Sequence, residues 1–222
     1  MLKKILGKLF FKEELEELQR FRNQISKNSI KSYYENAYPK KDITYVRTDK
    51  ETLKIDIRQF LNPNNFLLPT VGGKNDDEIA LNSLKWVIDN ISYVKDKKQY
   101  GMNEYWAYNY ETLKSKKGDC DDMAILLYCI MRKNGIPYWK IRVTAGNVDD
   151  GNVSGGHCFV TYLDEERLRW VLLDCCFHPN KKKIKDRKDY KDETYYKTTW
   201  FSFNENYSYA KDVKYLKYSN IK

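Results

Sequence analysis

The stretch GDCDDMAILLYCIMRKNGIP, residues 118–137, decides how this chain folds. Its acidic start is suited to a helix N-terminus, and the apolar run that follows predicts a helix from about Cys120 to Asn134. Gly135 suits the left-handed position after a helix, and Pro137 cannot continue one. A cysteine is therefore expected at the first turn of a clearly delimited helix.

Three strand-like runs follow this helix, at residues 138–145, 157–163 and 168–173. The polar turn between the last two runs predicts a hairpin. His157 begins the second run, and Asp174 directly follows the third. Cys120, His157 and Asp174 thus arrive in an order that a thiol acyl-transfer triad could use.

The chemistry expected of Cys120 depends on its ionisation. A cysteine attacks as the thiolate, and a helix N-terminus or a partner imidazolium lowers the thiol pKa toward neutrality. Unpaired backbone N–H groups in the same first turn could receive the negative oxygen of a tetrahedral intermediate. For an isolated cysteine, a buried structural thiol would be the simpler interpretation, so the hypothesis depends on its partners.

The chain contains two histidines, which limits the choice of base. His157 follows Gly155 and Gly156, which we expect to permit close approach of a substrate backbone. His178 precedes a proline in a loop-like stretch, where a structural role is the simpler interpretation. Asp174 closes an apolar run, where an unpaired charge is unfavourable, and an imidazole N–H would be a suitable partner.

A zinc site is the competing use of the five cysteines and two histidines. The spacing argues against it, because there is no Cys-x2-Cys pair and the adjacent Cys175 and Cys176 would point opposite ways along a strand. Residues 149–152 could hold calcium but lack the remaining ligands of a recognised loop, and are better interpreted as a turn. We therefore expect no metal and no cofactor.

The segments GDCDDMAILL, KNGIP, GGHCFVTYL and WVLLD, with the stretch 105–113 before them, resemble the transglutaminase-like superfamily. Within it, they are most similar to the bacterial and phage transglutaminase-like cysteine peptidases. The resemblance covers roughly residues 76–178. It implies an α+β fold with a papain/transglutaminase-like core, in which a nucleophile-bearing helix packs on an antiparallel β-sheet.

The resemblance also implies roles for particular residues. Cys120 would be the nucleophile, His157 the base and Asp174 the carboxylate that orients the histidine, with acyl transfer through a thioester. An aromatic or amide side chain upstream of the cysteine often assists the oxyanion in this family, and Trp106 is the candidate here. Cleft-wall packing is the alternative role for Trp106.

Pattern and composition divide the chain into four segments. Residues 1–30 predict an amphipathic helix that could pack on the domain, bind a protein partner or lie on a membrane surface. Residues 31–74 are expected to form an irregular arm. Residues 75–178 would be the catalytic core, and residues 179–222 a basic, Tyr- and Lys-rich extension.

The formal charge of +9 indicates attraction to something anionic, but not specifically. Residues 181–222 carry twelve Lys and Arg against six Asp and Glu, yet a solvated basic surface is the simpler reading, and nucleic acid is not an expected partner. An odd number of clustered cysteines, no cleavable signal sequence and no apolar run of about 20 residues predict a cytoplasmic protein without a transmembrane segment.

The sequence therefore predicts a thiol-dependent acyl enzyme acting on peptide or isopeptide amides of a peptide or protein substrate. It would be a cysteine peptidase or amidase if water resolves the thioester, and a transglutaminase if an amine does. The alternative is a structural, assembly or interaction module, such as a phage-related component, built on the same fold.

Overall fold

The computed structural model describes residues 43–49, 54–164, 166–167 and 169–210, together with Asn28, Lys31 and Ser32. The chain divides into two units, Met1–Tyr38 and Pro39–Lys222. In the second, the elements before residue 120 are β1 (Thr44–Val46), β2 (Lys54–Asp56), η1 (Ile57–Phe60), α2 (Asp76–Asn90), β3 (Ser92–Tyr93), α3 (Asp96–Gln99), α4 (Asn109–Ser115) and β4 (Lys117–Gly118). The later elements are α5 (Cys120–Lys133), η2 (Tyr138–Lys140), β5 (Ile141–Asp149), β6 (Ser154–Asp164), β7 (Arg169–Leu173), η3 (Ile184–Asp186), η4 (Tyr190–Asp192), β8 (Tyr196–Phe203) and β9 (Ser208–Ala210).

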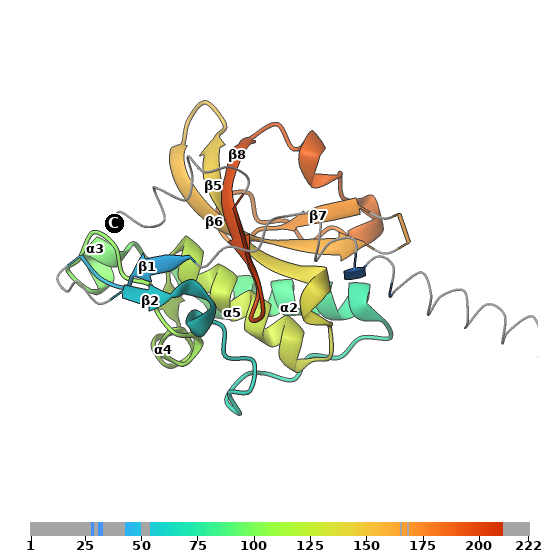
Figure 1. Ribbon diagram of the computed structural model, residues 1–222, viewed down its shortest axis with the longest axis horizontal. Coiled ribbons are helices and arrows are strands. Elements are labelled where there is room, and N and C mark those ends of the chain that lie inside the picture. The colour runs from blue at the N-terminus through green and yellow to red at the C-terminus, as the bar shows by residue number, and fades with distance from the viewer. Residues whose placement is uncertain are drawn as a thin grey trace, which may run out of the picture. The chain divides into compact units, whose positions relative to one another are not determined.

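A five-stranded antiparallel sheet, in the order β7-β6-β5-β8-β9, forms one layer of the second unit (Figure 1). β5 pairs along its whole length with residues 154–162 of β6, whereas β7 pairs only with the second half of β6, from Val160 onward. β8 pairs with the other side of β5, with register shifts near Gly146. A Cβ on Gly146 would lie 1.9 Å from the carbonyl oxygen of Thr198, so this irregular pairing requires a glycine.

Helix α5 forms the second layer and is buried along most of its length. Every residue from Asp121 to Met131 is buried, and a helix that is apolar on all sides needs cover on all sides. β5 and β6 contact it on one face, and α2 and α4 pack against the rest (Figure 1). The result is the α+β core, with a helix on an antiparallel sheet, that the sequence predicts.

The predicted boundaries of this core are corrected at both ends. β8 and β9 belong to the sheet, although they lie in the segment expected to be an extension after residue 178. The expected irregular arm also contributes to the core, since Ile43, Ile57 and Phe60 are fully buried there. β8 joins the sheet by pairing with the distant β5, and the buried residues of the arm are scattered among polar ones, so local periodicity does not reveal either segment.

The predicted amphipathic helix at residues 1–30 lies outside the described residues, apart from Asn28, and so does the end of the basic extension, residues 211–222. Across the part of the chain that the structure describes, no helix combines the length and apolar character needed to cross a bilayer.

Candidate functional site

Cys120 is the first residue of α5, and the turn before it is held by two carboxylates. The Asp119 side chain accepts the backbone N–H of Asp122, and the Asp122 carboxylate accepts the backbone N–H of Asp119 at 3.4 Å. Gly118 leaves the necessary space, because a Cβ there would lie 2.6 Å from the Cβ of Asp122. The GDCDD motif is therefore a capping box that presents Cys120 at the helix N-terminus.

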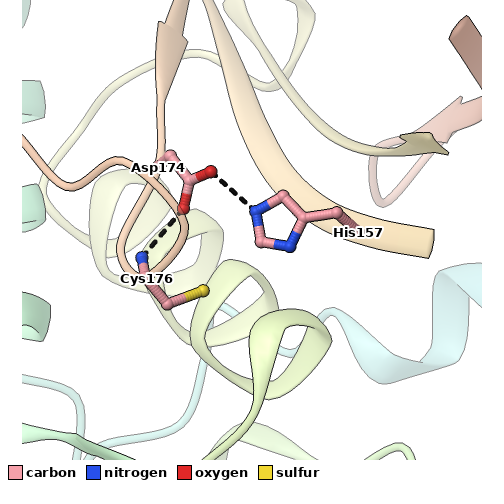
Figure 2. A group of neighbouring side chains, drawn as sticks. All are labelled: His157, Asp174 and Cys176. Carbon is pink, nitrogen blue, oxygen red and sulfur yellow. Dashed lines mark hydrogen bonds and ion pairs between the residues drawn. The ribbon is translucent and has the colours of Figure 1, made fainter. Parts of the chain in front are cut away.

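His157, in β6, and Asp174, directly after β7, form a buried pair (Figure 2). Nε2 of His157 lies 2.6 Å from Oδ2 of Asp174. The other carboxylate oxygen accepts backbone N–H groups from Cys176 at 2.8 Å and Phe177 at 3.1 Å. These bonds fix the plane of the carboxylate, and the pair leaves Nδ1 of His157 available for a second partner.

Asp174 carries its charge despite being only 2% exposed. Burial alone would raise its pKa, but the hydrogen bond and charge of His157, together with donors from Cys176 and Tyr196, hold the pKa below its ordinary value. Tyr196 donates its hydroxyl to Oδ2 at 2.7 Å. Sequence reasoning misses Tyr196, because it lies in β8, beyond the segment assigned to the core, and has no motif around it.

A pocket of 730 Å3 brings Cys120 and His157 together. One wall is apolar and includes Trp106, Trp200 and Phe201. The lining is also rich in carboxylates, and its charged members are Asp49, Asp96, Glu104, Asp119 and Asp121, with Lys95 and Lys97. A thiol, an imidazole and space for a substrate group thus share one cavity.

The two glycines before His157 have different surroundings. A Cβ on Gly156 would lie 2.8 Å from the Cη2 atom of Trp200, so the indole already fills the space beside this residue. Gly155 has open space around its Cα but adopts φ +155°. Gly156 therefore makes room for the Trp200 ring in the pocket wall, and the close approach of a substrate backbone stays a prediction.

Trp106 lies in the pocket wall but is 3% exposed. Its indole N–H donates to Oε1 of Glu104 at 2.8 Å, and its ring packs against Phe60 and Phe203. As described, the indole N–H is directed at a carboxylate. Assistance to an oxyanion would require the side chain to exchange this partner.

The surroundings of Cys120 do not favour an isolated thiolate. Burial raises the thiol pKa well above its ordinary value, and the charge of Asp119 acts in the same direction, against a stabilising backbone N–H from Cys158. The predicted lowering of the pKa by the helix N-terminus is therefore outweighed. The neutral thiol is therefore favoured over the thiolate in the described structure.

Three acidic side chains form a cluster next to Cys120. Asp96, Asp119 and Asp122 each place a carboxylate oxygen within 4.8 Å of the others. Burial and the charge of Asp119 raise the pKa of Asp96 to about 7 and also raise the pKa of Asp122, while burial raises the pKa of Asp119 itself. One oxygen each of Asp96 and Asp119 is buried with no hydrogen-bond partner. Such a group can share protons or bind a hard cation through its oxygens.

Cys176 and His178, which are also candidate zinc ligands, lie in different surroundings. The sulfur of Cys176 lies within 4.8 Å of a ligand nitrogen of His157 and a carboxylate oxygen of Asp174 (Figure 2). These three ligand atoms are fewer than the four of a structural zinc site, and the carboxylate is already fully hydrogen-bonded. His178 lies apart and exposed, 2.9 Å from Asp150. The sequence spacing did not predict that Cys176 lies beside His157 and Asp174.

Comparison with known proteins identifies relatives of the fold. The family model of the transglutaminase-like superfamily matches residues 67–175. Two solved structures of Legionella pneumophila LapG, one from EGTA-treated protein, each have a TM-score of 0.50 and 18% identity. The EGTA-treated structure covers 64% of this chain and 70% of its own, and the other covers 66% and 80%. At this identity the likeness concerns the fold alone, and none of the curated proteins is a match.

Proposed function

Because the chain belongs to the transglutaminase-like superfamily, we propose that it is a cysteine peptidase or amidase acting on peptide or isopeptide amides. Superfamily membership supports a thiol-dependent peptidase-type function in general terms. The observation that carries the specific proposal is the 2.6 Å bond between His157 and Asp174, with His157 and Cys120 lining one pocket. The substrate is a peptide or protein.

In the proposed reaction, the sulfur of Cys120 bonds to the carbonyl carbon while its proton passes to Nδ1 of His157. Asp174 keeps Nε2 protonated and stabilises the resulting imidazolium. The tetrahedral intermediate then expels the amine, which takes the proton from His157, and leaves a thioester. A raised thiol pKa fits this order, because the proton leaves the sulfur only when the imidazole is ready to accept it.

The oxyanion is proposed to bind at the N-terminus of α5, where the backbone N–H of Cys120 is free of the helix ladder. Trp106 is the second proposed donor. Its indole N–H must first leave Glu104, so substrate entry would be coupled to a rotation in the pocket wall. Replacing Trp106 with Phe should lower kcat more than it raises KM if this donation occurs.

We propose water as the group that resolves the thioester. His157 would deprotonate the water, and the acid product would leave with Cys120 protonated again. A transglutaminase reaction differs only in that a primary amine takes the place of water. Mass spectrometry of a glutamine-containing protein incubated with a primary amine separates the two, since amide formation and deamidation change the mass differently.

The first test is site-directed thiol labelling with iodoacetamide at pH 7, mapped by mass spectrometry. Cys120 and Cys176 are the half-buried cysteines, and the other three are buried. Cys120 should react fastest in the wild type, and the reaction should be lost in His157→Asn, which cannot accept its proton. His178→Asn is the matched control and should label as the wild type does.

The second test is cleavage of a peptide library by the same variants. Cys120→Ala and His157→Asn should lose activity by about a thousandfold or more, as in other triad enzymes. Activity that survives in Cys120→Ala would overturn the proposal. A wild type that neither cleaves nor transfers, and whose labelling does not depend on His157, would instead favour the assembly module.

A further inference from the structure

We propose that Tyr196 is a positioning residue of the site, whose hydroxyl completes the hydrogen bonding of Asp174 and thereby sets the orientation and basicity of His157. The inference deepens the proposed function and rests on it only for its effect on reaction rate. The contact between Tyr196 and Asp174 can be tested on the protein without any substrate.

The first argument is that Asp174 has no acceptor site to spare. An ionised carboxylate offers about four lone-pair sites. Oδ1 accepts from the backbone N–H groups of Cys176 and Phe177, while Oδ2 accepts from Nε2 of His157 at 2.6 Å and from the Tyr196 hydroxyl at 2.7 Å. Tyr196 and His157 therefore share one carboxylate oxygen. A change in the bond from Tyr196 to Oδ2 directly alters the bond between Oδ2 and Nε2 of His157.

The second argument is that the hydroxyl is held where it is by aromatic packing. The Tyr196 ring meets Phe159 edge-on at 5.0 Å and Phe177 edge-on at 5.8 Å between centroids. Tyr190 packs against it at 6.4 Å. Together with Val148 and Leu172, these residues form a small apolar cluster separate from the main core. Edge-to-face contacts on several sides fix the ring and therefore the direction of its hydroxyl.

The third argument concerns what the hydroxyl does that a phenyl ring would not. Asp174 is buried, so its charge interacts strongly with whatever donors are present. Because Tyr196 and His157 both donate to Oδ2, this oxygen stabilises the imidazolium less than it would with His157 alone. Removing the hydroxyl leaves His157 as the one side-chain donor to this oxygen, which strengthens its bond and favours the imidazolium.

Tyr196 also lies beyond residue 175, where the match to the family model ends. It enters the site because β8 pairs with β5 and aligns Tyr196 with Val148. The contribution therefore comes from a strand that the family match does not include. The other titratable groups around His157 are Cys120 and Asp119 at the start of α5, the neighbouring Cys158, and Cys176 after β7.

The test is an NMR titration of the histidines in Tyr196→Phe, which retains the ring and removes the hydroxyl. Because the chain has two histidines, the imidazole signals are easily assigned, and exposed His178 is an internal reference. The His157 pKa should rise by about one unit, the shift expected for losing one shared hydrogen bond to a charged group, and the Nε2 proton signal should move. The His178 pKa should stay unchanged.

Tyr190→Phe is the matched control. It removes a half-buried hydroxyl beside the same cluster, and that hydroxyl bonds Thr199 at 2.8 Å instead of Asp174. Both variants should have similar thermal stability, and only Tyr196→Phe should alter the His157 titration. An unchanged His157 pKa in Tyr196→Phe, or the same change in Tyr190→Phe, overturns the proposal.

Kinetics provide the second readout. In Tyr196→Phe, kcat should fall about tenfold with KM nearly constant, and the acid limb of the pH profile should move to higher pH with the histidine, as the loss of one such bond predicts. If the NMR shift occurs but the wild type has no amide-directed activity, the positioning role stands and the proposed function fails. If the wild type is active and Tyr196→Phe changes neither kcat nor the His157 titration, the proposed function stands and the positioning role fails.

Discussion

At the scale of single residues, the pocket depends on positions where no side chain fits. Gly156 faces the Trp200 ring, and Gly118 faces the Asp122 carboxylate. Each glycine lets a larger side chain occupy the space next to a proposed catalytic residue, either His157 or Cys120. The glycines therefore shape the site by leaving space for their neighbours.

Gly156→Ala tests this reading. The new methyl group would stand 2.8 Å from the Trp200 ring, so the indole must shift within the pocket wall. We expect a loss of about 1–3 kcal/mol in the free energy of unfolding, typical of overpacking, measured by urea denaturation. Cleavage activity should fall as well. Gly72→Ala, where a Cβ meets nothing within 4 Å, is the control and should change neither quantity.

The identity of Cys120, His157 and Asp174 as candidates could be inferred from sequence, because each stands at an end of a strongly patterned segment. Their partners could not. Tyr196 reaches Asp174 through a strand pairing of β8 with β5, and Cys176 reaches the pair by a turn after β7. Local patterns do not encode such contacts, which arise only when distant segments are brought together.

At the scale of elements, β8 carries more of the fold than its sequence indicates. The strand reads YKTTWFSF, and its apolar positions are concentrated at one end. Phe201 and Phe203 belong to the main core with α5, whereas Tyr196 belongs to the smaller cluster. A strand with Thr and Lys at its other positions resembles a polar tail until its pairing with β5 is known.

A chain truncated after residue 178 should therefore not fold. It would lose Phe201 and Phe203, each fully or almost fully buried, which contribute about 1.5–3 kcal/mol apiece, and it would expose the β5 edge. Circular dichroism and thermal unfolding provide the measurement. A chain ending at Ala210, which keeps all five strands, is the comparison and should unfold cooperatively. A folded, cooperative 1–178 fragment would contradict this account of the core.

At the scale of the whole molecule, charge is distributed unevenly. The formal net charge is +9, yet the pocket wall gathers Asp49, Asp96, Glu104, Asp119 and Asp121 beside two lysines. The basic exterior says little about the site, which is locally acidic. A charge total for the chain therefore predicts its solubility and weak association better than its chemistry.

This acidic cluster predicts how stability depends on pH. The folded pKa of Asp96 is raised to about 7 by burial and by Asp119, whereas an unfolded aspartate titrates near about 4. The native state thus holds a proton that the unfolded state has lost. The free energy of unfolding should fall as pH rises from about 4 to about 7 and lose nothing further from this group above that range.

Asp96→Asn is the decisive variant, because its amide oxygen can still accept the backbone N–H of Tyr105, which Asp96 binds at 2.6 Å. Its free energy of unfolding should decline less between pH 5 and pH 8 and exceed that of the wild type at pH 8. Urea denaturation with EDTA present measures this without interference from a bridging cation. Asp192→Asn is the control, since Asp192 is an exposed carboxylate that does not line the pocket and should leave the pH dependence of the wild type unchanged. Equal pH dependence in Asp96→Asn and the wild type would assign the decline to other groups.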